Sequence, residues 1–160
     1  MPRTTRPAVR RFDSPQQEAY LSLWRTYDRL RTYEDELFAT IDLTAQQYNL
    51  LRLLRASYPD TVPTLSLVVQ MVSRAPDVTR MLDRLEERRL IARARSIEDR
   101  RTVLVGIADA GLALLDRIAE PLRVCHKRQL GHLTSSDLKM LVQLLRKARA
   151  PHEAEDSHWK

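Results

Sequence analysis

The most constraining feature of the sequence is the stretch from Val78 to Ile107, where a helical pattern is followed at once by two strand patterns. Steps of about 100° per residue on a helix after Pro76 separate apolar side chains from long polar ones. The apolar side holds Val78, Met81, Leu82 and Leu85, and the other side holds Pro76, Arg80, Asp83, Arg84 and Glu87. Two short runs, 90–95 and 102–107, flank the charged loop 96–101 and predict a β-hairpin. This order predicts a winged helix-turn-helix.

Capping signals predict where the other helices begin. Ser14 and Pro15 start a long amphipathic helix, and Thr44 with Gln47 forms a capping box that starts the next one. The segment 64–72 fits either a strand or a short helix that buries Leu65, Val68, Val69 and Val72, and the turn and helix after it favour the helix. Two further helices are expected from about Asp109, with a stripe of Leu112, Leu115, Ile118, Leu122 and Cys125, and after Thr134, with Leu138, Leu141 and Leu145 inward.

Composition limits the classes of protein that the chain can belong to. Its 160 residues suit one compact unit, and no apolar run reaches the roughly 18–20 residues that cross a bilayer. One cysteine excludes an intramolecular disulfide and suits a reducing compartment, so we expect a cytoplasmic protein with no membrane partner. No catalytic constellation, phosphate loop or metal-ligand spacing is evident, and we therefore expect no enzyme activity, cofactor or metal.

The positive charge favours nucleic acid as the partner. The sequence holds 27 Lys and Arg against 21 Asp and Glu, and all but four of the cations are arginine, whose planar guanidinium suits phosphates and guanine edges. Arg80 and Arg84 lie one helical turn apart and can both point into a major groove. The alternative is a solvated helix face whose acids pair with arginines. In the loop, Asp99 is expected to orient Arg101 and stiffen the hairpin, leaving Arg100 or Arg101 to reach DNA.

The run DVTRMLDRLEERRLIARARSIEDRRTVLVGIADAGLALL (77–115) resembles the MarR family of bacterial transcription regulators. In that family a recognition helix is followed by a wing carrying Asp-x-Arg and then by a helix start with glycine. The segments LTAQQYNLLRLL (43–54) and LTSSDLKMLVQLLRKA (133–148) match its helical frame. The resemblance spans about Pro15 to Ala148, in order.

The resemblance implies a mainly α fold with a small β-hairpin wing, in which a winged helix-turn-helix domain is joined to a helical dimerisation domain. We expect a flexible basic arm (1–13), a dimerisation domain (14–42 and 109–148), a winged domain (43–108) and a frayed tail (149–160). Family members are homodimers, so the implied partner is a near-palindromic operator in double-stranded DNA. The implied DNA contacts are Arg74, Pro76, Asp77, Thr79, Arg80 and Arg84 on the helix and Asp99, Arg100 and Arg101 on the wing.

The implied function is a sequence-specific dimeric regulator of transcription, a repressor released by a small anionic aromatic effector. Tyr20, Trp24, Tyr27 and Tyr48 are candidates for an effector pocket, although helical spacing also suits a core or a dimer interface. Cys125 lies on an apolar stripe and is expected to be a buried packing residue rather than a redox sensor. The alternative function is a helical ligand-binding or protein-interaction module whose winged domain no longer binds DNA.

The sequence departs from the family pattern at three places. Arg89 replaces the glycine after the recognition helix, so a left-handed cap there is either absent or costs about 1 kcal/mol. Ala108 replaces the threonine that caps the helix after the wing, and Asp109 is expected to cap instead. The segment 64–72 is also more apolar than the usual scaffold helix.

Overall fold

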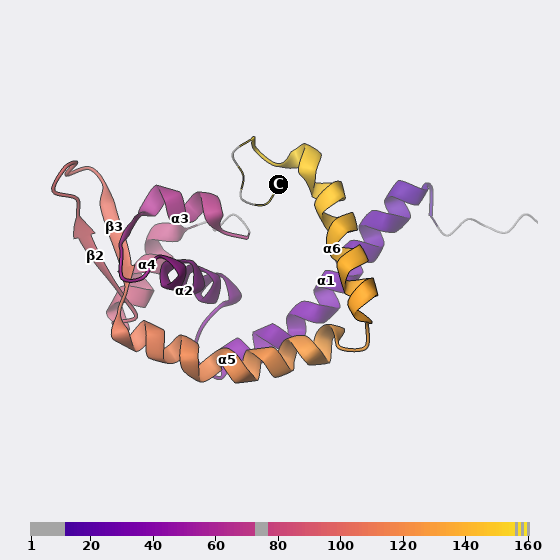
Figure 1. Cartoon of the computed structure of the whole chain (residues 1–160), viewed down its shortest axis with the longest axis horizontal. Helices are drawn as coiled ribbons and strands as arrows, with labels where there is room; N and C mark the ends of the chain where they lie inside the picture. The colour runs from indigo at the N-terminus through magenta and orange to yellow at the C-terminus, as the bar shows by residue number, and fades with distance from the viewer. Residues whose placement is uncertain (1–11, 73–76, 156, 158, 160) are drawn as a thin grey trace, which may run out of the picture.

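The chain folds into helices with one small sheet at one end of the molecule, away from the first and last α-helices (Figure 1). The computed structural model describes residues 12–72, 77–155, 157 and 159. In chain order the elements are α1 (Pro15–Ala39), α2 (Ala45–Ser57), β1 (Val62–Pro63), α3 (Thr64–Gln70), α4 (Val78–Glu87), β2 (Ile91–Arg95), β3 (Val103–Ile107), α5 (Asp109–Leu130), α6 (Ser135–Arg149) and the 3-10 turn η1 (Ala150–His152). The predicted fold class is confirmed, with β2 and β3 projecting as the wing (Figure 1).

The sheet contains the predicted hairpin and one strand that the sequence pattern did not indicate. Strands β2 and β3 pair antiparallel, with Ile91 opposite Ile107 and Arg95 opposite Val103. Strand β1 pairs with the other edge of β3, with Val62 opposite Val105. A strand of two residues that includes a proline has no alternation to detect, and only its pairing with β3 defines it.

Side-chain caps begin most of the helices where the sequence predicted them. The Thr44 hydroxyl accepts from the Gln47 amide at 3.2 Å while the Gln47 side chain accepts from the Thr44 amide at 2.9 Å, which confirms the capping box. The prediction that Asp109 caps α5 is wrong, because Asp109 is the first helical residue. Ala108 occupies the cap position without a side-chain bond, and its own amide donates to the Leu90 carbonyl at 3.0 Å, so sheet pairing determines where α5 begins.

One continuous core joins the winged unit to the first half of α5. Leu50, Leu85 and Val105 have no exposed surface, and Phe38, near the end of α1, is 2% exposed. The predicted α5 stripe is buried, apart from a partly buried Leu112. The core therefore crosses both expected domain boundaries, at 42/43 and at 108/109.

The face that α3 buries differs from the predicted one. Leu65, Val68, Val69 and Val72 are exposed, and Leu67 and Met71 are buried instead. Because apolar residues occupy both faces of this short segment, periodicity could not choose between them. The pairing of β1 with β3 sets the direction in which α3 leaves the sheet and so turns Leu67 toward the core.

The helix α4 ends in a left-handed cap at Arg89. Of the two outcomes expected for this position, the cap is therefore present rather than absent. Arg89 has φ of 57°, its amide donates to the Glu86 carbonyl at 2.7 Å, and the Leu90 amide donates to the Leu85 carbonyl at 3.0 Å. These two bonds form a Schellman cap, in which glycine is the favoured residue because a Cβ is strained at positive φ.

We expect Arg89→Gly to raise the free energy of unfolding by about 1 kcal/mol and the melting temperature by roughly 2–4 °C. The reason is relief of the left-handed strain at this position, and thermal unfolding followed by circular dichroism measures it. Arg89→Ala is the control, because it removes the same charge and keeps a Cβ. An equal gain in Arg89→Ala would attribute the effect to charge rather than to backbone conformation.

Candidate nucleic-acid interface

The outer face of α4 presents the polar side chains that the sequence assigned to DNA. Thr79, Arg80 and Arg84 are exposed, whereas Met81, Leu82 and Leu85 on the opposite side are buried. Asp77 caps the helix, and its carboxylate accepts from the Arg80 amide at 2.9 Å. This carboxylate therefore holds the first turn of the helix and positions the backbone beside Arg80.

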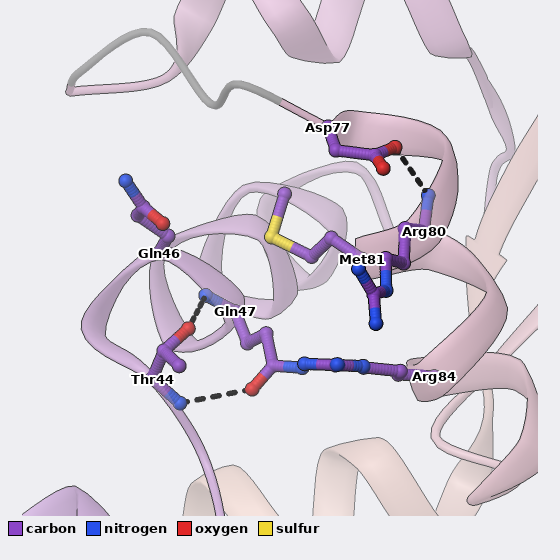
Figure 2. Close-up of a pocket in the computed structure, with 7 residues that line it drawn as sticks. All are labelled: Thr44, Gln46, Gln47, Asp77, Arg80, Met81 and Arg84. Atoms are coloured by element: carbon purple, nitrogen blue, oxygen red, sulfur yellow. Dashed lines mark hydrogen bonds between the residues drawn. The ribbon is translucent and has the colours of Figure 1, made fainter.

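Three of the predicted residues line a crevice between α4 and the first turn of α2. Asp77, Arg80 and Arg84 lie on one side of this crevice, with Thr44, Gln46 and Gln47 on the other and Met81 at its floor. Figure 2 shows Arg84 extended toward Gln47, and Arg80 turned into the space between the helices. Gln46 was not predicted as a site residue. The sequence feature that could have indicated it is its place in the first turn of a capped helix, and that turn faces Arg80 and Arg84.

Two acids of α4 that could repel a phosphate backbone are paired with one arginine of the wing. Arg93 on β2 contacts Asp83 at 2.7 Å and Glu86 at 2.5 Å, and its own side chain is only 24% exposed. Hydrogen bonding to Arg93 lowers the pKa of Glu86, and hydrogen bonds to Glu86 and Asp83 raise the pKa of Arg93. One guanidinium therefore offsets one of the two negative charges and locks α4 to β2.

The loop between β2 and β3 is held from inside by Asp99. One carboxylate oxygen accepts from the Arg101 amide at 3.0 Å, and the other accepts from the Thr102 hydroxyl at 2.8 Å. These bonds lower the pKa of Asp99, with the Arg101 amide as the larger cause. The predicted contact between Asp99 and Arg101 is present, although Asp99 binds the Arg101 backbone and not the guanidinium. Arg100 and Arg101 are exposed.

A second groove, of about 350 Å³, lies between the wing and the α3–α4 unit. It brings Thr79 of α4 next to Arg101 of the wing, and its walls also include Arg93, Leu65 and Val103. The predicted residues thus lie on both sides of α4: Asp77, Arg80 and Arg84 beside α2, and Thr79 and Arg101 beside the wing. Two residues of the prediction, Arg74 and Pro76, fall outside the described residues, as does most of the basic arm.

Arg88 anchors α4 to the rest of the chain, a role that the sequence did not indicate. Its guanidinium donates to the Ile41 carbonyl at 3.0 Å and also to the Asp42 carbonyl. Both acceptors lie in the α1–α2 junction, so Arg88 joins the C-terminal end of α4 to the segment that follows α1. A charged residue on an exposed helix edge gives no local signal of such a distant acceptor.

The four aromatic residues proposed for an effector pocket do not come together within one chain. Tyr20, Trp24 and Tyr27 lie on the exposed part of α1, and each is at least 60% exposed. Tyr48 on α2 instead stacks on Phe38, with ring centroids 5.0 Å apart. From Tyr27 to Phe38 the axis of α1 rises by about 16 Å, which is too far for one small ligand site.

Cys125 has the properties of a packing residue, as predicted. It is 9% exposed, and burial is the main factor that raises its thiol pKa, followed by the charge of Glu34. A raised pKa disfavours the thiolate, which is the reactive form of cysteine. Within the described part of the chain, no helix is long and apolar enough to span a bilayer.

We expect Asp99→Asn to weaken DNA binding, because the variant keeps only one of the two oxygens that accept from the Arg101 amide and the Thr102 hydroxyl. The loss should be larger for specific than for random duplex, since a loose loop still supplies charge but no fixed position. Fluorescence anisotropy with both duplexes measures it. Glu98→Gln is the matched control, because it removes the same charge one residue away, and equal losses in the two variants would contradict a positioning role.

The chain is similar in sequence and in structure to several known proteins. A sequence model of the MarR family matches residues 43–103. The crystal structure of a MarR transcription factor from Planctomyces limnophilus is 52% identical, with a TM-score of 0.68 over 84% of this chain and 98% of that one. BpsR of Bordetella bronchiseptica, whose DNA binding is regulated by 6-hydroxynicotinic acid, is 26% identical, with a TM-score of 0.74 over 86% and 96% of the two chains. The transcriptional repressor IacR of Pseudomonas putida is 24% identical over 135 residues, which are 83% of this chain and 80% of IacR.

Proposed function

The chain belongs to the MarR family of transcription regulators, and we propose that it acts as a homodimeric repressor of a near-palindromic operator in double-stranded DNA. In this proposal α4 enters the major groove, and the wing lies over the adjacent minor groove or phosphates. Arg80 and Arg84 reach base edges, and Arg100 and Arg101 contact the backbone. The two half-sites lie about 34–36 Å apart, one helical turn of DNA.

The observation that carries the proposal is which charged side chains of α4 are paired and which are not. Arg80 and Arg84 are exposed, while Asp83 and Glu86 are bound by Arg93. An ordinary solvated helix face would pair its arginines with its own acids at i,i+4. Here Asp83 and Glu86 turn to the wing instead. Among the described residues, neither Arg80 nor Arg84 forms a salt bridge with Glu87 or another acid, which leaves both arginines available for an external anion.

Apolar surface on α1, α5 and α6 supports a dimer built from the terminal helices. The exposed apolar side chains are Tyr20, Leu21, Leu23, Trp24 and Tyr27 on α1, Val124 on α5, and Met140, Val142 and Leu144 on α6. Helix α6 has no fully buried residue among its 15. A second copy of the chain would cover these side chains, because exposed apolar surface is costly in a monomer. Segments 14–42 and 109–148 are thus the proposed dimerisation unit.

The decisive experiment measures fluorescence anisotropy of the promoter-proximal duplex beside the protein's own gene against a scrambled duplex, across a salt series. The proposal expects tight, sequence-selective binding whose logarithm falls linearly with the logarithm of salt concentration. Sedimentation at the same concentrations should give twice the 18.6 kDa mass of the chain. If neither this duplex nor a genomic fragment library yields a selective site, a module that has lost DNA binding becomes the better description.

We also propose that a small anionic aromatic compound releases the DNA, by analogy with the named effector of BpsR. Tyr20, Trp24 and Tyr27 are exposed in one chain, so they could line a site only where a second protomer supplies the other wall. Titrating 6-hydroxynicotinate and benzoate into the protein–DNA complex tests this idea. Trp24→Ala should shift the midpoint of release at protein concentrations where sedimentation shows that the variant is still a dimer. No release at millimolar concentration of either compound would reject the idea.

A further inference from the structure

The C-terminal tail does not simply end in solvent, because its described residues form a connected set of hydrogen bonds. Arg149, the last residue of α6, donates through Nε and Nη2 to the Trp159 carbonyl at 3.1 and 2.8 Å. Its guanidinium also lies 5.6 Å from the centroid of the Trp159 ring. Ser157 completes the set, since its hydroxyl donates to Glu153 at 2.7 Å and accepts from the Trp159 amide at 3.1 Å.

This set of bonds turns the tail back on itself. Glu153 lies 3.2 Å from Arg149, one helical turn along, so the same guanidinium holds both the beginning and the end of the tail. Trp159, Glu153 and Ser157 are all partly buried. The segment 149–160 was expected to be frayed, and its pattern of short polar residues gives no sign of these contacts. They depend on Arg149 being the final residue of a rigid helix.

The folded tail reaches the DNA-binding unit at one point. The indole Nε1 of Trp159 donates to the carbonyl of Gln70 at 3.4 Å. Gln70 is the last residue of α3. The carbonyls of the last helical turn have no amide donor within the helix, so they can accept hydrogen bonds from elsewhere. In sequence, α3 is followed by residues 71–77 and then by α4, which carries Arg80 and Arg84.

We propose that Arg149 and Trp159 are positioning residues that tie α6 to the end of α3 and thereby set the placement of α4 relative to the terminal helices. The tie is strong at α6, where two charge-assisted bonds hold Trp159, and weak at α3, where one long neutral bond holds Gln70. A contact of this kind biases the position of the DNA-binding unit and can still open when that unit moves. The proposal deepens the proposed function, since the spacing of two recognition helices depends on that placement.

The tail leaves the apolar face of α3 uncovered. Leu65, Val69 and Val72 are 80%, 59% and 64% exposed, respectively, and they lie on the same short helix as Gln70 or just beyond it. The contact between the tail and α3 therefore rests on the hydrogen bond from Trp159 to Gln70. Trp159 is also the only Phe, Tyr or Trp after Tyr58 in the sequence.

Hydrogen exchange of the full-length protein, followed by mass spectrometry, tests the tie directly. Trp159→Ala should increase amide exchange at least about threefold in peptides covering 65–84 and leave peptides within α2 and α5 unchanged. Trp159→Phe should have much of the same effect, because phenylalanine keeps a ring but lacks the Nε1–H donor. His152→Ala is the matched control, since this exposed side chain lies in the same tail.

Two results would overturn the proposal. One is unchanged exchange in 65–84 when Trp159 is replaced, and the other is an equal increase throughout the core, which would indicate general loss of stability. Because hydrogen exchange is measured without DNA, the experiment tests the link from Trp159 to α3 even if no operator is found. With DNA selected from a random library by the unmodified protein, Trp159→Ala should also reduce the preference for the selected half-site spacing over spacings changed by one base pair. An unaltered preference would contradict the role in placement.

Discussion

Replacing Arg84 by alanine should weaken binding to the operator by about 1–3 kcal/mol and relax the base preference at one position of each half-site. Arg84 is exposed on the outer face of α4, and it extends across the crevice toward α2, where no carboxylate lines the opposite wall (Figure 2). Its fork of donors is therefore free to make a bidentate contact with a guanine edge. Anisotropy titrations with the selected operator and with single-base variants of it measure both effects.

The control for Arg84→Ala is Arg117→Ala, which removes one positive charge from the exposed side of α5 and lowers the net charge by the same amount. The long-range attraction to DNA then falls equally in both variants, and only Arg84→Ala should change the ranking of duplexes. Equal weakening on operator and random DNA would identify Arg84 as a phosphate contact. No difference between the two variants would remove Arg84 from the interface.

The largest effect on stability is expected for Gly111→Ala. A Cβ at position 111 would collide with the carbonyl oxygen of Leu90 and lie 2.8 Å from Cγ1 of Ile107. The same carbonyl accepts from the Ala108 amide at 3.0 Å, so it cannot move without breaking the bond that begins α5. We expect a loss of about 2–3 kcal/mol, after the usual helical advantage of alanine over glycine, and a melting temperature lower by roughly 5–10 °C.

Gly111→Ala should also weaken operator binding at temperatures where the protein remains folded. Leu90 connects the end of α4 to β2, and displacement of its backbone changes the position of the wing relative to α4. Gly106→Ala is the matched control, because its added Cβ would lie 3.0 Å from a side-chain methyl group of Thr61, which can move. If Gly106→Ala is as destabilising as Gly111→Ala, general crowding rather than contact with the Leu90 backbone is the cause.

Local patterns predicted most of the fold correctly, because each depends on residues within one or two helical turns. The caps at Ser14, Thr44 and Thr134 satisfy amides three residues ahead, and the stripe ending at Cys125 follows the helical period. The hairpin was likewise predicted from a charged loop between two apolar runs. For the same reason the polar residues on the outer face of α4 follow from the amino-acid order alone.

The errors occurred where a distant segment decides the outcome. Strand β1 exists only because Val62 pairs with Val105, and the face of α3 that is buried depends on that pairing. Asp109 does not cap α5, since the bond between Ala108 and Leu90 determines the start of the helix. Each of these contacts joins residues at least 18 positions apart, and no periodicity within a segment reports on them.

The sequence by itself determined which segments are helical, which face of α4 is polar and that a basic hairpin follows that helix. The tertiary structure alone decided that Arg93 binds both Asp83 and Glu86, that Arg88 anchors α4 to the α1–α2 junction and that Trp159 reaches Gln70. The physical reason is that helix caps and amphipathic faces are properties of adjacent residues. A salt bridge or a carbonyl acceptor between separate elements depends on where the packed core places their backbones.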